Sequence, residues 1–170
     1  KMSGLKSPNK IIGVFHYPKE REILITDWVV VLDDVRDPGN LGTIIRLCDW
    51  FGIDQLVCSL NTVDCFNPKT LQATMGSLGR MNIFYTDVIH FLKNTTLPIY
   101  GAFMNGTTVY EEQFPENGVL VMGNEANGVS AEVEALIAKK IAIPQFGKSK
   151  TESLNVATAT AILLNEIRRG

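Results

Sequence analysis

The chain has 170 residues, of which 45% are hydrophobic and 20% are charged, so it can bury one substantial core and is not a disordered segment. Its formal net charge of -2 gives no overall attraction to nucleic acid, whose binding depends heavily on neutralised phosphates. No run reaches the roughly 18 apolar residues of a membrane span, and the first residues lack the apolar centre of a signal peptide. We therefore expect a cytoplasmic protein that is not in a membrane.

Strand and helix signals alternate from about residue 27, which is typical of an α/β domain with a mostly parallel sheet and helices on both faces. Each expected strand is a short hydrophobic run bounded by turn residues. The expected strands are residues 28–34, 55–58, 82–85, 99–103, 119–122 and 141–143.

The segments between these strands predict helices. Residues 41–51 repeat apolar side chains at helical spacing and are followed by Gly52, which stops a helix. Asn67 can cap a second helix that runs through residue 75, and Ser130 precedes another amphipathic segment. A last helix is expected over residues 154–168. Its small residues would let a neighbouring backbone approach closely, and they are Ala157, Ala159 and Ala161.

Residues 1–26 show no clear unit of structure. The run IIGVF could form an edge strand, but the segment is otherwise typical of a connector. Because the chain opens abruptly inside what reads as a continuous region, we expect an upstream part that precedes this connector.

The cysteines and histidines do not form a ligand pattern. Cys48, Cys58 and Cys65 are odd in number and are never spaced as CxxC, and His16 and His90 stand alone. This favours neither a disulfide framework nor a zinc site, so we expect no metal.

A first candidate functional loop, DPGNLG, follows the first predicted strand. Pro38 and Gly39 turn the chain, and Asn40 can cap the helix that begins at residue 41. Capping alone would explain Asn40. Arg46, however, lies on the helix face away from the apolar residues, so it could reach a phosphate instead of only contacting solvent.

Two further loops follow later strands. In VMGNEANGVS, an Asn-Gly turn and a cap at Ser130 explain most polar residues but not Glu125. In IPQFGKSKTESLNVA, a cap role would explain Ser153 or Asn155, yet a long polar loop after a buried strand also suits substrate contact. Ligands of open α/β sheets collect at such strand ends.

Taken in order, DPGNLGTIIR, VMGNEANGVS and IPQFGKSKTESLNVATATAILLNE resemble the three motifs of the SpoU family of RNA ribose methyltransferases, in the SPOUT superfamily. The resemblance covers roughly residues 28–168. It implies an S-adenosylmethionine-dependent enzyme that methylates a ribose 2'-hydroxyl in ribosomal or transfer RNA. It also implies a C-terminal trefoil knot, a homodimer through the knotted region, and a catalytic domain over residues 27–170. Residues 1–26 would then be the linker from an N-terminal RNA-binding domain.

The resemblance also assigns the site. Arg46 matches the family's catalytic arginine and Asn40 the asparagine before it, while Glu125 is expected to balance the cofactor's sulfonium or to order its loop. A guanidinium stays protonated at working pH, so we favour Arg46 as a phosphate clamp over a general base. The cofactor would contact mainly backbone groups of the second and third loops, at Met122, Gly123, Ile143, Ser153, Leu154 and Asn155.

Residues 74–83 depart from the family, which often has a more alanine-rich segment there, so RNA contact by Ser77 or Arg80 stays open. The sequence also leaves two other functions to consider. A non-catalytic RNA-binding or assembly module with the same fold would bind the cofactor weakly or not at all. A nicotinamide-dependent dehydrogenase is disfavoured, because no GxGxxG follows the first strand.

Overall fold

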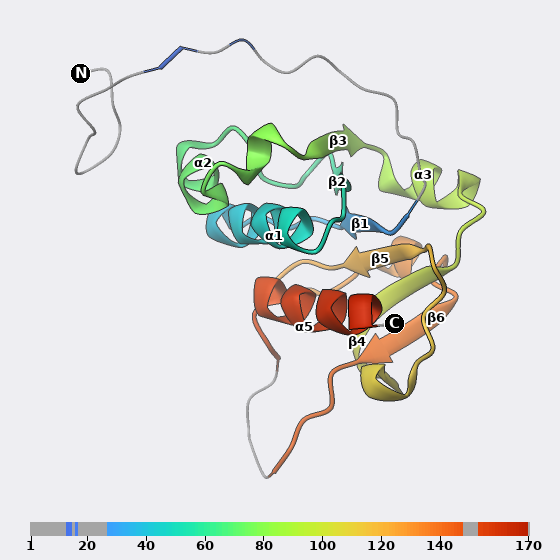
Figure 1. Cartoon of the computed structure of the whole chain (residues 1–170). Helices are drawn as coiled ribbons and strands as arrows, with labels where there is room; N and C mark the ends of the chain where they lie inside the picture. Colours follow the sequence, from blue (N-terminus) through green and yellow to red (C-terminus); the bar gives the residue numbers. More distant parts are fainter. Residues whose placement is uncertain (1–12, 15, 17–26, 148–152, 170) are drawn as a thin grey trace.

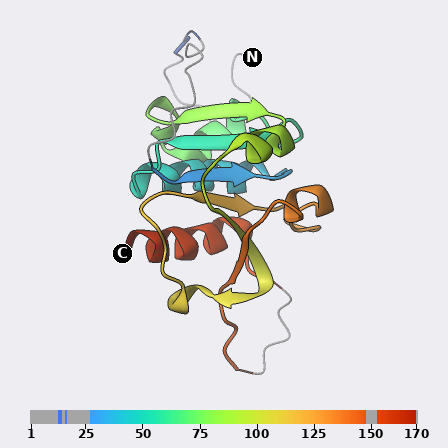
Figure 2. The ribbon, with the colours of Figure 1, turned by 90° about the vertical axis from the view of Figure 1, so that its right-hand side faces the viewer.

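The computed structural model describes residues 13, 14, 16, 27–147 and 153–169. In these ranges the strands form one six-stranded sheet in the order β3-β2-β1-β5-β4-β6, and every strand pair in it is parallel. Figure 2 shows β3, β2, β1 and β5 one above another. The bounds are Val29–Leu32 for β1, Gln55–Ser59 for β2, Asn82–Thr86 for β3, Ile99–Thr108 for β4, Val119–Met122 for β5 and Lys139–Ala142 for β6.

Helices cover both faces of the sheet, as the alternation of strand side chains requires. One face of β1, with Val30 and Leu32, packs in a core with α1 and α5, which lie side by side in Figure 1. The opposite face, with Val29 and Val31, packs with α3 and α4. The helices are Pro38–Trp50 for α1, Pro68–Thr74 for α2, Val88–Asn94 for α3, Ala131–Glu134 for α4 and Val156–Arg169 for α5. The predicted α/β fold class is therefore confirmed.

The strand predictions are confirmed in place and differ mainly in length. β4 continues to Thr108, five residues beyond the predicted end, because two separate parts of β4, before and after a bulge, pair with β6. Ala102 and Thr107 both pair with Ile141, so residues 103–106 bulge out of the ladder. Asn105 and Gly106 in this bulge are typical of a turn, so the sequence gives no signal for the second half of the strand. β6 ends at Ala142, so Ile143 already belongs to the loop that follows.

The prediction that Asn40 caps the first helix is wrong. α1 begins at Pro38, and its cap is Asp37, whose carboxylate accepts a hydrogen bond from the Asn40 amide at 2.8 Å. Proline suits the first helical position because its missing N–H has no partner there in any helix. Asn40 therefore lies inside the first turn, where its side chain can bond to other groups.

The other cap predictions had mixed outcomes. Asn67 caps α2 by accepting from the Lys69 amide at 2.9 Å, as predicted. Asn155 caps α5, which begins at Val156 and not at residue 154. Ser130 precedes the short α4 but its side chain makes no capping bond. Its amide instead donates to the buried Asp33 carboxylate at 2.7 Å. The helix α3 was not predicted.

Two predictions fall on residues outside the described ranges. The trefoil knot depends on how the chain passes from β6 to α5, and residues 148–152 of that path are not described. The proposed connector and its edge strand lie in residues 1–26, of which only 13, 14 and 16 are described. Within the described ranges, no helix combines the length and the apolar character needed to cross a membrane.

Candidate active site

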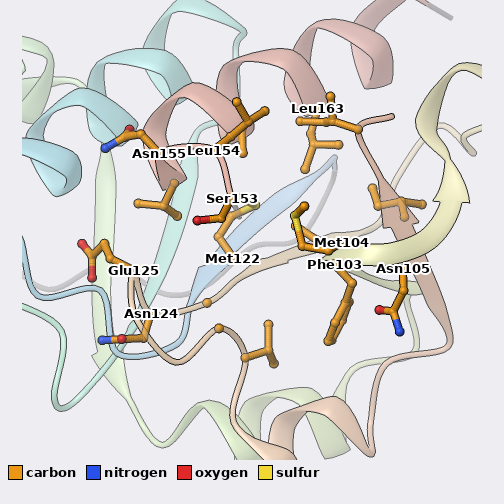
Figure 3. A pocket seen from close by; sticks show the side chains of 18 of the residues that line it. Phe103, Met104, Asn105, Met122, Asn124, Glu125, Ser153, Leu154, Asn155 and Leu163 are labelled. Carbon is orange, nitrogen blue, oxygen red and sulfur yellow. The ribbon is translucent and has the colours of Figure 1, made fainter. Parts of the chain in front are cut away.

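A cavity of about 940 Å³ opens at the carboxyl ends of β5 and β6. Its wall comes from the β4 bulge, the loop after β5, the loop after β6 and the start of α5, as Figure 3 shows. The structure thus brings together two of the three loops that the motifs singled out. All six residues predicted to contact the cofactor line this cavity: Met122, Gly123, Ile143, Ser153, Leu154 and Asn155.

The loop after β5 folds back on itself over a glycine. Asn124 and Gly128 exchange two backbone hydrogen bonds of 2.9 Å, and Gly128 has a φ of 69°. A Cβ on Gly123 would lie 2.3 Å from the Gly128 carbonyl carbon and the Val129 nitrogen, so no larger residue fits without moving the loop. The Asn124 side chain donates to the Asp34 carbonyl at 2.7 Å, which fixes the loop to the end of β1.

Glu125 connects this loop to the start of α1. Its carboxylate accepts hydrogen bonds from the amides of Arg36 at 3.2 Å and Asp37 at 3.1 Å, and from the Asn40 side chain at 3.0 Å. Burial alone would raise the pKa of Glu125, but these bonds together lower it, so the group is ionised at neutral pH. Of the two roles expected for Glu125, the ordering of the loop is the one that these contacts serve.

Asn40 extends the connection to the third loop. Its side-chain oxygen accepts from the Asn155 side chain at 2.8 Å, and the Asn155 oxygen accepts from the amides of Ala157 and Thr158. Glu125, Asn40 and Asn155 therefore form a chain of side-chain hydrogen bonds that joins all three loops. We call it the three-loop link.

Arg46 lies on the exposed face of α1 and does not line the cavity. It follows Asn40 by six residues, or about 9 Å along the helix axis at 1.5 Å per residue. Within the described ranges it has no ion pair. By contrast, Arg80 pairs with Asp49 at 2.6 Å and Arg168 with Asp27 at 2.5 Å, so both of these cations are engaged in structural contacts.

Sequence reasoning missed the part of the wall that the β4 bulge provides. Phe103, Met104 and Asn105 line the cavity there. The bulge ends at Gly106, where a Cβ would lie 2.6 Å from the carbonyl carbon and oxygen of Lys140. A glycine inside a strand is the signal that could have located this close approach.

The described wall carries two acidic residues, Glu125 and Glu134, and neither lysine nor arginine. Its other side chains are largely apolar, including Ile143, Leu154 and Leu163. Such a wall suits a ligand with apolar surface and a positive charge better than an anionic one. In the described ranges, no cluster of three or more histidines, cysteines or acids could hold a metal.

Comparison with known proteins agrees with this geometry. Residues 27–165 match the model of the SpoU rRNA Methylase family. The chain is 36% identical over 167 residues to the 23S rRNA (guanosine(2553)-2'-O)-methyltransferase RlmP of Bacillus subtilis, covering 96% of this chain and 66% of that protein.

Two solved structures are similar in fold. A protein of the TrmH family from Porphyromonas gingivalis has a TM-score of 0.83 and 43% identity, over 89% of this chain and 63% of that chain. An AdoMet-bound rRNA methyltransferase from Sinorhizobium meliloti has a TM-score of 0.79 and 35% identity, over 86% of this chain and 57% of that chain. The chain thus spans less than two thirds of each of these proteins. The family match covers most of its own length, and the chain belongs to the SpoU rRNA methylase family.

Proposed function

We propose that this chain carries the catalytic domain of an S-adenosylmethionine-dependent methyltransferase that modifies a ribose 2'-hydroxyl in structured RNA, either ribosomal or transfer. One observation carries the proposal: the second and third motif loops wall a single cavity, and the three-loop link connects both of them to the first. The Bacillus relative acts on a ribose 2'-oxygen of 23S rRNA according to its name.

The lining and the charge of the cavity suit the cofactor. Met122 and Gly123 offer backbone groups at the end of β5, and the tight turn at Gly123 leaves no side chain in the way. Ile143 and Leu154 supply apolar surface of the kind that adenine contacts. Since the described wall holds no cation, nothing in it repels the sulfonium.

When bound, the cofactor supplies an electrophilic methyl group. The ribose 2'-oxygen would accept that methyl group as the carbon–sulfur bond breaks, and its hydroxyl proton would pass to a base, for which a phosphate oxygen of the RNA is our candidate. The chain's contribution is to hold the two groups in line, an effect that can lower a barrier by several kcal/mol. Arg46 would clamp a phosphate and stabilise the developing negative charge on oxygen. The polar side-chain atoms of Asn40 and Glu125 form the hydrogen bonds of the three-loop link, so these two residues act by positioning the loops of the site.

We also propose that two copies of the chain form the active enzyme. Arg46 is outside the cavity wall of its own subunit, so a site completed by a second subunit accounts for its position. Trp50, one turn further along the same face of α1, is 81% exposed, which favours a protein partner on this face. A cytoplasmic location remains a prediction from the sequence.

Calorimetry with S-adenosylmethionine and its demethylated product tests the proposal against a non-catalytic RNA-binding module. The enzyme should bind both and transfer labelled methyl groups to RNA from cells that lack the protein. Folded protein that binds neither compound would support the non-catalytic module.

A further inference from the structure

The outer part of the cavity is apolar and open. Along the chain from Ile141 to Phe146 the wall changes from buried to exposed, so this segment runs from the floor of the cavity to its mouth. Phe146 is 80% exposed and Met104, from the β4 bulge, is 60% exposed. They are two of the nine exposed large hydrophobic side chains in the described ranges, and both line this one cavity.

The size and charge of the cavity leave room for more than the cofactor. A volume of about 940 Å³ is at the upper end of the range for small-molecule sites, roughly 300–1,000 Å³. A phosphate is unsuited to this space, since the described wall holds no cation and carries Glu125, while its other acid, Glu134, is paired with Lys140. A nucleobase is suited to it, because a base is flat, uncharged and able to stack on an aromatic ring.

We propose that Phe146 is a positioning residue for the RNA, on whose ring the base of the target nucleotide stacks. This inference rests on the proposed function. On the proposed function the methyl donor would occupy the inner part of the cavity, near Met122 and Gly123, so the ribose would approach from the open side. A nucleotide held there in single-stranded form places its base on the outer wall, and its phosphates outside the cavity.

The test measures RNA and cofactor binding separately. The acceptor is RNA purified from cells that lack the protein, and the donor is labelled S-adenosylmethionine. Removing a base–aromatic stack in Phe146→Ala should raise the KM for RNA roughly 5- to 150-fold, from the ~1–3 kcal/mol of such a stack. The affinity for S-adenosylhomocysteine, measured by calorimetry, should stay at the wild-type value.

Three further variants test whether loss of the aromatic ring causes the higher KM for RNA. Phe146→Trp should keep the KM for RNA near the wild-type value because it keeps an aromatic face. Phe146→Leu, which keeps apolar volume without a ring, should raise the KM for RNA as Phe146→Ala does. Tyr110→Ala is the matched control, since Tyr110 is an exposed aromatic outside the cavity wall and should leave the KM unchanged. Thermal melting of each variant checks that the fold is intact.

The outcomes separate this inference from the function on which it rests. A wild-type protein that neither binds the cofactor nor labels RNA overturns both. A wild-type protein that labels RNA, with a Phe146→Ala variant of equal KM, overturns the stacking role alone. A variant that loses cofactor affinity, or that changes from dimer to monomer, also overturns it, because the ring would then contact the cofactor or the second subunit.

Discussion

Glu125→Gln is the substitution that most directly tests the three-loop link. The Glu125 oxygens accept one bond at Oε2, from the Arg36 amide, and two at Oε1, from the Asp37 amide and the Asn40 side chain. Glutamine can keep its oxygen at the position with two donors. Its NH₂ group then faces the Arg36 amide, which is itself a donor, so one bond is lost and the other two lose the assistance of the charge.

The expected cost follows from these three bonds. A hydrogen bond to a charged group contributes about 1.5–3 kcal/mol, and the exposed position of Glu125 reduces that contribution. We therefore expect a loss of about 1–2 kcal/mol in the ordering of the loop after β5. Because the cofactor needs that loop in place, its affinity should fall about 5- to 30-fold.

Calorimetry with S-adenosylhomocysteine measures this loss directly. Glu116→Gln removes an exposed carboxylate away from the cavity and serves as the control. A double-mutant cycle with Asn40→Ala should show a coupling between the two sites, because the side chains are bonded to each other. If Glu125→Gln bound the cofactor as tightly as the wild type, the link would not order the cofactor site and the reasoning would be refuted.

Three other substitutions test separate parts of the site and fold. Arg46→Ala should abolish methyl transfer while cofactor affinity, measured by calorimetry, is retained, since Arg46 is outside the cavity wall; equal loss of both would contradict that division. Leu154→Arg places a cation in the apolar wall and should remove cofactor binding, so unchanged affinity would mean that the pocket is misassigned. Asp27→Asn breaks the ion pair with Arg168 and should lower the melting temperature by about 2–4 °C at neutral pH. Burial would raise the pKa of Asp27, but the Arg168 hydrogen bond leaves this pKa below its ordinary value, so this stabilisation is present above about pH 4 and is lost as the pH falls through the folded-state pKa. The melting temperatures of wild type and variant should therefore converge in acid, and a constant difference would exclude the ion pair as the cause.

Local patterns predicted the elements that one signal dominates. The apolar run of β5 was predicted with its exact bounds, and Asn67 was recognised as a cap. The start of α1 was misjudged because DPGN contains two possible caps, Asp37 and Asn40, and propensity alone does not choose between them. The second half of β4 was missed because its partner, β6, lies more than thirty residues away, and because residues 105–108 of β4 are polar or glycine.

In the site, too, local sequence patterns did not predict contacts between residues that are far apart in the chain. The motifs identified Glu125, Asn40 and Asn155, but the bonds of the three-loop link join residues 85 and 115 positions apart. No periodicity or spacing reports a contact of that separation, and only the sheet order brings the three loops to one edge. The bulge residues Phe103, Met104 and Asn105 were missed for a related reason, since their place in the wall depends on a register shift between two strands.

The charge distribution predicts how this chain binds RNA. Seven of the nine lysines and arginines in the described ranges are in ion pairs with acids, and Arg46 and Lys93 are the two others. Each phosphate neutralised on a single strand adds about -0.7 to the slope of log K against log salt concentration. Within the described ranges Arg46 is the main cation without an ion pair, so phosphate contacts from these ranges should give a shallow slope of about -1 to -2, and Arg46→Ala should reduce its size by about 0.7. Anisotropy titrations with labelled RNA at several salt concentrations measure this slope. A value near -6 would mean that phosphate contacts dominate, whereas a shallow slope together with a raised KM in Phe146→Ala would assign much of the RNA affinity to base stacking, which salt does not screen.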